Sequence, residues 1–455
     1  MTITIIKIPN RARLVLATLE NHGYPSYLAG GIVRDSIIGR VSHDIDIVTA
    51  ALPEQVTALF PHHVPDGKAQ GVIKAIFDID GDSEVVDIAT MRKDGEYLDG
   101  RRPDGVEFTT NLEDDVKRRD FTINALFADK EGNVIDLVDG LKDIKAHVVR
   151  CVGNPNTRFQ EDHLRMLRAI RFGCQLNFEI HPDTLEAIVT NHKLLAVISQ
   201  ERIWQELWKI MESPLTLDGV KLLIMTGLMQ NVLPEVINCH AIKQDPIHHP
   251  EGDVLIHSLD VLNTLASAEP LTKLAGLLHD IGKCTTSSAR VEDFVYRISH
   301  IDHENTGAVL AEQALRRLTC PSDIRDKIVW LVKNHMRAHK VKEMKKSKLM
   351  SFLREAVEQN TLTSMIALQH ADSNHDSSKD CFDFFKEILA QPLLVKKVAE
   401  PGFVNGDDLI TLGLPQGKKI GIVLATLREA QDEGIVEDRE SALKYARQLV
   451  EEQTR

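Results

Sequence analysis

The pattern of apolar and polar positions changes once along the chain. As far as about Phe127, short runs rich in β-branched residues alternate with helical patterns, as in YLAGGIVRDSIIG, HDIDIVTA, GVIKAIFDI and SEVVDIATM. From about Asp143 onward, apolar residues recur every three or four positions, as in HLRMLRAIRFGCQL, RIWQELWKIM, TKLAGLLHDIG and KIVWLVKNHM. The change predicts an α+β fold, in which a small mixed sheet forms an N-terminal head domain and the remaining domains are all-α.

This change near Asp143 also marks the first expected domain boundary. The chain of 455 residues is too long for one ordinary core, since domains usually hold about 100 to 200 residues. Breaks rich in Pro and Gly at 246–252 and 401–402 mark further boundaries. We expect a head over residues 1–145, helical segments over 146–240 and 241–385, and a helical C-terminal region over 386–455.

The composition, 43% hydrophobic and 27% charged, fits a soluble globular protein. No segment approaches about 18 uninterrupted apolar residues, and the N-terminus lacks the basic start and apolar core of a signal peptide. We therefore expect a cytoplasmic protein with no membrane partner. The six cysteines show no close spacing and are predicted to be buried free thiols: Cys151, Cys174, Cys239, Cys284, Cys320 and Cys381.

The net charge of -13 is unfavourable for binding a polyanion, because phosphate contacts need cations. Aromatic residues, at 5%, are too sparse for long stacking platforms, so any RNA contact is expected to depend on Arg and Lys. These are clustered in two runs: Arg165, Arg168 and Arg171, and Lys340, Lys342, Lys345, Lys346 and Lys348. The lysine run is more typical of a solvated helix face.

A Gly-Gly turn follows the first apolar strand. Gly30 and Gly31 end this strand and open a helix, where missing β-carbons let backbone N–H groups approach a triphosphate. Arg34, one turn later, adds a cation. Such a turn alone also fits plain packing.

Two carboxylates come next. SHDIDIVTA alternates, so Asp44 and Asp46 are expected on one strand face and apolar residues on the other. Neighbouring like charges are costly unless a divalent cation lies between them, and oxygen ligands indicate Mg²⁺. Nucleotidyl transfer uses such metal ions, and Asp87 in EVVDIAT is the candidate third carboxylate. The alternative is an exposed edge strand with acidic decoration.

Three ordered motifs resemble the class II tRNA nucleotidyltransferases and bacterial poly(A) polymerases. They are LAGGIVRDSIIGR with HDIDIVT, RRDFTINAL at 118–126, and EDHLRMLRAIRF at 161–172. The resemblance implies a polymerase-β-like head that uses CTP and ATP, with tRNA as the partner. Many relatives have Lys at the position of His43 and Glu at the position of Asp87. The second departure bears on the role of Asp87.

The resemblance also implies roles for individual residues. Arg119 and Asp120 would contact the sugar or the phosphates, and Asn124 would support their turn. The loop KDGEYLDGRRPDG, with Asp99, Arg101 and Arg102, would take part in the change from C to A selection.

Asp162, Arg165, Arg168 and Arg171 recur at three-residue steps, which predicts a polar stripe on one helix. A carboxylate can accept from the amino group of cytosine or adenine, whereas uracil and guanine present an oxygen there. An adjacent Arg can donate to the ring nitrogen. Asp162 with Arg165 would therefore admit C and A, which is the template role that the resemblance implies. A structural salt-bridge ladder is the alternative.

A second chemical centre lies in VLIHSLDVL and LAGLLHDIGK. His257, the pair His279 and Asp280, and the later Asp372 match the order H, HD, D of the HD phosphohydrolases. His303 and His335 extend the set towards a two-metal site. Imidazole ligands favour Ni²⁺, Co²⁺ or Mn²⁺ over Mg²⁺. A lone buried His is more often a satisfied core residue, but an HD pair is not explained by packing.

The sequence thus predicts an enzyme that adds C, C and A to tRNA 3′ ends from CTP and ATP. The HD site is predicted to hydrolyse phosphoester ends, such as a 2′,3′-cyclic phosphate, in tRNA repair. The alternatives are a poly(A) polymerase, an enzyme that adds only CC or only A, a phosphohydrolase with a nucleotide-binding head, and a non-catalytic RNA-binding protein.

Overall fold

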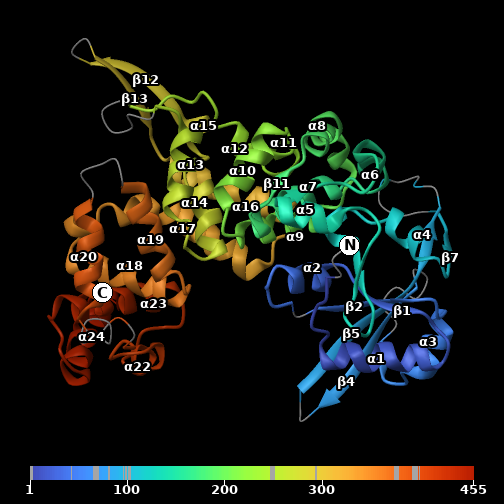
Figure 1. The fold of residues 1–455 in the computed structure, drawn as a ribbon. Helices are drawn as coiled ribbons and strands as arrows, with labels where there is room; N and C mark the ends of the chain where they lie inside the picture. The colour runs from blue at the N-terminus through green and yellow to red at the C-terminus, as the bar shows by residue number, and fades with distance from the viewer. Residues whose placement is uncertain are drawn as a thin grey trace. The chain divides into compact units, whose positions relative to one another are not determined.

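The structure is a computed structural model that describes residues 4–42, 44–64, 71–79, 82–95, 97, 100, 104–245, 252–292, 295–373, 379–391, 398 and 400–454. The chain forms two compact units, Met1–Pro234 and Glu235–Arg455. The predicted α+β class is confirmed, with a sheet near the N-terminus and a largely helical remainder (Figure 1). None of the described helices has both the length and the hydropathy needed to cross a bilayer.

A seven-stranded mixed sheet forms the head, in the order β3-β4-β5-β2-β1-β8-β9. Its strands are β1 (Ser26–Ala29), β2 (Ile45–Thr49), β3 (His63–Val64), β4 (Val72–Ile79), β5 (Asp82–Thr90), β8 (Leu126–Ala128) and β9 (Val134–Asp136). Among these described strands only β2 and β5 pair in parallel, and their register sets Asp46 opposite Asp87. Ile47 and Ile88, also paired, are fully buried, so the alternation of SHDIDIVTA directs its apolar residues into the core.

Short helices surround this sheet: α1 (Asn10–Asn21), α2 (Gly31–Ile37), α3 (Pro53–Leu59), α4 (Leu112–Lys117), η2 (Thr122–Asn124) and α5 (Gly140–Ala146). A separate ladder joins β6 (Arg92–Asp94) to β7 (Val106–Phe108). α1 packs on β1 and β2, and α2 packs on β1 and β8. The head thereby holds the β1-to-α2 turn beside the start of β2.

The rest of the first unit is helical: α6 (Pro155–Glu161), α7 (Arg165–Leu176), α8 (Pro182–Asn191), η3 (His192–Val197), α9 (Gln200–Met211), α10 (Thr216–Met225) and α11 (Met229–Val232). α7 packs against α9 and α10, and its Asn177 C-cap adopts the left-handed conformation that ends helices. A short parallel ladder pairs β10 (Val148–Val149) with β11 (Glu179–Ile180). α12 (Pro234–Ile237) begins at the last residue of this unit.

The second unit contains α13 (Val254–Thr264), α14 (Pro270–Leu278), α15 (Lys283–Thr286), α16 (His303–Arg317), α17 (Ser322–Ala338), η4 (Val341–Glu343), α18 (Lys346–Glu358), α19 (Leu362–Asp372) and α20 (Lys379–Leu389). α14 packs against α13, α17 and α19. α22 (Gly406–Thr411), α23 (Lys418–Glu433) and α24 (Arg439–Thr454) form another apolar core, and α18 packs on α23.

An antiparallel ribbon that the apolar pattern did not predict interrupts these helices. It joins β12 (Ser287–Glu292) to β13 (Val295–His300) and projects from the helices of its unit (Figure 1). The predicted lysine run lies around η4 and the start of α18, and all five side chains are exposed: Lys340, Lys342, Lys345, Lys346 and Lys348.

Candidate active sites

The β1-to-α2 turn depends on glycine at position 30. Gly30 has φ 73, a backbone conformation that residues with a β-carbon rarely adopt. A β-carbon there would lie 3.3 Å from Nη1 of Arg119 and 4.0 Å from Oδ2 of Asp46. Gly31 begins α2, and the buried Arg34 one turn later donates to Asn124 and pairs with Asp35. The turn thus brings the backbone close to both an arginine and a carboxylate.

Three carboxylates lie around the start of β2. Asp46 and Asp87 are paired in the β2–β5 register, and Asp44 directly precedes the strand. Burial, together with the charges of Asp87 and Asp44, raises the pKa of Asp46 to about 6, although Arg119 and Lys74 act in the opposite direction. Nζ of Lys74 lies 3.0 Å from Oδ2 of Asp87. The group therefore carries excess negative charge that a divalent cation would relieve, and its oxygen ligands fit Mg²⁺.

A pocket of about 520 Å³ adjoins these carboxylates. Its lining includes ten of the residues predicted for the nucleotidyltransferase site but not Asp87: Gly31, Arg34, Asp44, Asp46, Arg119, Asp120, Asp162, Arg165, Arg168 and Arg171. Gly30, Arg118, Asn124, Phe172, Arg202 and Lys209 complete the lining. Two acidic residues at the sheet thus face a surface rich in arginine.

Ion pairs hold most of these arginines in place. Arg119 pairs with the fully buried Asp115, whose other oxygen pairs with Arg118. Nη2 of Arg168 lies 2.6 Å from Asp120. Although burial raises the pKa of Asp120, the charge of Arg168 lowers it to about 2, so Asp120 is ionised at neutral pH. The arginines are therefore pre-oriented on the pocket wall, as recognition of phosphate oxygens requires.

Arg171 is held by a carboxylate on the neighbouring helix. Its Nε donates to Oε2 of Glu206 at 2.6 Å, and both side chains are buried. Asn124 donates to Asp120 through Nδ2 at 3.2 Å and accepts from Arg34, which agrees with its predicted role in the turn.

Asp162 does not belong to the predicted helical stripe, so that part of the prediction is wrong. It follows α6 with an extended backbone, because α7 begins only at Arg165. Its Oδ1 accepts from the backbone N–H of Leu164 at 3.2 Å, and its carboxylate pairs with Arg202 at 2.9 Å. Arg165 instead donates to Glu161 at 2.6 Å. Both residues line the pocket, but each has its own ion-pair partner.

α9 contributes residues that the sequence analysis missed. Arg202, Glu206 and Lys209 are separated by four and three positions, which places them on one helix face. Arg202 and Lys209 line the pocket, and Glu206 is 4% exposed. The helical spacing of one acidic and two basic residues was the available signal in the sequence.

The predicted loop residues Asp99, Arg101 and Arg102, as well as His43, lie outside the described residues. Gly100, between them, is described, and its carbonyl accepts from the backbone N–H of His163 at 3.1 Å. This contact joins the loop to the residue after Asp162.

We expect base selection to depend on the ion pair between Asp162 and Arg202. Asp162→Asn keeps the oxygen that accepts from Leu164 N but adds a donor, which can satisfy the carbonyl of uracil. The preference for CTP over UTP, measured as the ratio of the two kcat/KM values, should fall by about tenfold or more. Arg202→Gln should also lower the preference for CTP over UTP, because the Asp162 carboxylate loses the ion pair that orients it.

Arg150→Gln is the matched control, since Arg150 pairs with Asp143 away from the pocket lining. An unchanged CTP preference in Asp162→Asn would show that this carboxylate does not read the base.

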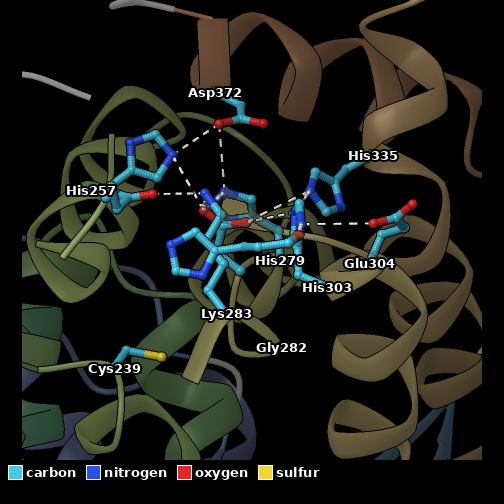
Figure 2. A network of polar contacts seen from close by, with 12 residues as sticks. Cys239, His257, His279, Gly282, Lys283, His303, Glu304, His335 and Asp372 are labelled. Atoms are coloured by element: carbon cyan, nitrogen blue, oxygen red, sulfur yellow. Dashed lines mark hydrogen bonds and ion pairs between the residues drawn. The ribbon is translucent and has the colours of Figure 1, made fainter. Parts of the chain in front are cut away.

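The second unit gathers a cluster of His and Asp side chains, which Figure 2 shows pointing toward one another. They come from α13, α16, α17 and α19 and from the residues that follow α14. His257 lies on α13, the pair His279 and Asp280 directly follows α14, and Asp372 ends α19. His257 Nε2 lies 2.9 Å from Asp372 Oδ1, and His279 Nε2 lies 3.5 Å from the same oxygen. The structure therefore brings together all four predicted HD residues.

His303, on α16, and His335, on α17, also belong to the cluster, and both lie close to Oδ1 of Asp280. Their Nε2 atoms lie 3.3 and 3.7 Å from Asp280 Oδ1. Two groups of three residues have the geometry to hold a metal ion: His257, His279 and Asp280, and Asp280, His303 and His335. Asp280 is common to both groups, so it could help to hold a cation in either of them.

Buried polar atoms in this cluster favour bound cations. His279 Nε2 lies 3.2 Å from Asp280 Oδ2. Neither His279 Nε2 nor the other oxygen, Asp280 Oδ1, has a hydrogen-bond partner of suitable geometry among the described residues. Although burial lowers the pKa of His279, the charges of Asp280 and Asp372 raise it to about 10. Burial, followed by the charge of His279, lowers the pKa of His335 to about 3. A cation that displaces the proton of His279 would thus find imidazole and carboxylate ligand atoms in a buried space, which fits a transition metal.

Two further residues brace the cluster and were not predicted. His339 Nε2 lies 2.7 Å from Asp372 Oδ2, and Lys283 Nζ lies 2.6 Å from Asp280 Oδ2. Both hold carboxylate oxygens of the cluster, as residues behind metal ligands commonly do.

Three family models match the chain in succession. They are the poly A polymerase head domain at residues 26–150, the probable RNA and SrmB- binding site of polymerase A at 177–239, and the HD domain at 254–375. The CCA-adding enzyme of Lactobacillus helveticus (strain DPC 4571) is 42% identical over 233 residues, which are 50% of this chain and 57% of that protein. The CCA-adding enzyme of Levilactobacillus brevis is 45% identical over 219 residues, which are 48% of this chain and 54% of that protein. The chain thus spans about half the length of the curated relatives that it matches.

Solved structures resemble the chain over nearly its whole length. The Bacillus stearothermophilus CCA-adding enzyme in complex with CTP has a TM-score of 0.70 and 27% identity, covering 98% of both chains. The Thermotoga maritima CCA-adding enzyme complexed with tRNA_CCA has a TM-score of 0.61 and 20% identity, covering 98% of this chain and 99% of that one. The second likeness concerns the fold alone.

Proposed function

Since the chain belongs to the class II CCA-adding enzyme family, we propose that it adds C, C and A to the 3′ ends of tRNA from CTP and ATP. The observation that carries this proposal is that Asp44, Asp46 and a set of ion-paired arginines line the same pocket. The two carboxylates suit a cation and the attacking hydroxyl, and the arginines suit a triphosphate and a base.

Different residues of the pocket would contact the cation, the triphosphate and the base. Asp44 and Asp46, with Asp87 behind them, would hold Mg²⁺, which when bound lowers the pKa of the 3′-hydroxyl and neutralises the departing pyrophosphate. The turn at Gly30 and Gly31 leaves room for the triphosphate, and Arg34 and Arg119 add positive charge beside it. Asp162, oriented by Arg202, would accept from the amino group of cytosine or adenine.

The experiment is incorporation of labelled CTP and ATP into tRNA that lacks its 3′ terminus. We expect two C residues followed by one A, and then termination. Long A-only tails without use of CTP would favour a poly(A) polymerase, and CC alone or A alone would favour a partial enzyme. Either result would overturn full CCA addition.

The raised pKa of Asp46 predicts a dependence of the Mg²⁺ requirement on pH. Its carboxyl has a pKa of about 6, so below that pH a proton competes with the cation for the same oxygens. The Mg²⁺ concentration for half-maximal CTP incorporation should rise about tenfold for each pH unit below about 6 and stay level above it. Incorporation measured over a Mg²⁺ series at each pH tests this. A constant requirement down to pH of about 5 would contradict the placement of Asp46 in the cation site.

We further propose that the cluster in the second unit is a metal-dependent phosphohydrolase site. Its support is the pair of three-residue groups that share the buried Asp280. With Ni²⁺, Co²⁺ or Mn²⁺ bound, such a site supplies an activated water for attack on phosphorus. RNA that ends in a 2′,3′-cyclic phosphate is the proposed substrate, and opening of the ring with each metal is the test. No turnover with any of the three metals, on a chain shown to bind them, would contradict the proposal.

A further inference from the structure

We propose that Cys239 and Cys284 form a reversible oxidation site, at which a hydroperoxide generates an intrachain disulfide that clamps the segment carrying His257, His279 and Asp280. The six thiols were predicted to be buried and free. All are free, but Cys284 is only partly buried, and its sulfur lies 2.9 Å from that of Cys239.

The distance between the two sulfur atoms supports bond formation. A disulfide bond is about 2.05 Å long, so each sulfur must move by only about half an ångström. The two residues belong to different local segments, since Cys239 follows α12 and Cys284 lies in α15. Rotation of the side chains with a small shift of α15 can provide this movement.

The surroundings of the two thiols assign them different roles. Cys239 is 1% exposed, whereas Cys284 is reachable by a small oxidant. A hydrogen bond between the sulfurs lowers the pKa of Cys284 and raises that of Cys239, so Cys284 loses its proton more readily than Cys239. A thiolate is the form that attacks peroxide.

The chemistry balances in two steps. The thiolate of Cys284 attacks one oxygen of the hydroperoxide, the O–O bond breaks, and a sulfenic acid and an alcohol or water form. The sulfur of Cys239 then attacks the sulfenic sulfur, the S–O bond breaks, and water leaves with the proton of Cys239. The two thiols together lose two electrons, and the peroxide gains them.

The bond would join the two ends of the segment that contains α13 and α14. His257, His279 and Asp280 all lie between the cysteines in sequence, and Cys284 directly follows Lys283, whose Nζ is 2.6 Å from Asp280. Figure 2 shows Cys239 on the same side of the cluster as Lys283 and Gly282. Closing this segment removes conformational freedom from residues that would hold a cation, so a bound cation should leave more slowly.

The other cysteines provide controls within the same chain. Burial raises the pKa of Cys151, Cys174 and Cys320 to about 12 in each case, which disfavours the thiolate. Cys381 donates to the carbonyl of His339 at 3.1 Å. We therefore expect oxidation to select one pair.

The first experiment treats the full chain with hydrogen peroxide and maps peptides by mass spectrometry without reduction. We expect a cross-link between Cys239 and Cys284 that dithiothreitol reverses, an unchanged cross-link in Cys320→Ser, and a dimedone adduct on Cys284 in Cys239→Ser. Both thiols remaining free for alkylation, or a different cross-link, would overturn the oxidation site.

The second experiment loads the full chain with Mn²⁺ and measures its release into excess EDTA. After oxidation, release should be slower by about threefold or more, with no change in peroxide-treated Cys239→Ser. Equal rates despite the cross-link would overturn the clamp. The clamp rests on the proposed cation site, whereas the cross-link does not. Absence of Mn²⁺ binding in the reduced chain would therefore overturn the cation site and the clamp but leave the cross-link standing.

Discussion

Asp46→Asn abolishes nucleotide addition, with an expected loss of about a thousandfold or more in kcat for CTP incorporation. The substitution keeps the shape of the side chain but removes the charge that would hold Mg²⁺ beside the attacking hydroxyl. Asp44→Asn should have a similar effect, since both carboxylates border the pocket. Single-turnover incorporation on tRNA that lacks its terminus separates this loss from a change in product release.

The thermal midpoint of the Asp46→Asn protein shows whether a loss of nucleotide addition comes from the missing carboxylate or from unfolding. Because the pKa of Asp46 is raised to about 6, the ionised carboxylate destabilises the folded state above that pH, and the penalty is relieved as the pH falls through it. Asn carries no charge, so at neutral pH and in EDTA the thermal midpoint should stay level or rise. Glu84→Gln, a neutralisation at an exposed position of β5, is the matched control and should retain full addition. An active Asp46→Asn would refute the metal assignment.

Asp280→Asn should remove the proposed phosphohydrolase activity and spare the proposed nucleotide addition. Its carboxylate is shared by both three-residue groups, so its loss affects every cation that the cluster could hold. Hydrolysis of a 2′,3′-cyclic phosphate end should fall by about a hundredfold or more, while CTP incorporation stays within about twofold. Metal content by mass spectrometry and phosphate release, measured on the same preparation, test both statements.

A buried carboxylate beside four imidazoles can also matter for folding, so a second substitution is needed. His303→Gln affects only the group with His335 and should lower hydrolysis and metal content to an intermediate level. Asp260→Asn, on the exposed side of α13, should change neither. Undiminished hydrolysis in a folded Asp280→Asn protein would place the activity elsewhere.

The main features of both sites could be predicted because their residues lie close together in sequence. Asp44 and Asp46 alternate on one strand, and the helical pattern around His279 and Asp280 leaves no packing explanation for two adjacent polar groups. The order of motifs then indicated which distant His and Asp complete the second cluster. The structure placed Asp372, the most distant of them, in contact with His257.

The remaining features depend on tertiary contacts that no local pattern records. Asp162 fits a three-residue periodicity with Arg165, but a break between two helices turns it towards Arg202 on α9. Cys239 and Cys284 are far apart in sequence and meet only because α15 packs near the end of α12. Such pairings require knowledge of how helices pack, which periodicity does not contain.

Because β2 and β5 pair in parallel, changes far from the pocket can alter which side chain lies beside Asp46. Asp46 and Asp87 are neighbours only because Ile45 is aligned with Val86, and β5 is held in that alignment by its long antiparallel partner β4. A slip of one residue between the strands would turn Asp87 towards the opposite face and an isoleucine towards the cation. An insertion or deletion within β4 or β5 should thus abolish the proposed nucleotide addition without altering any residue that lines the pocket.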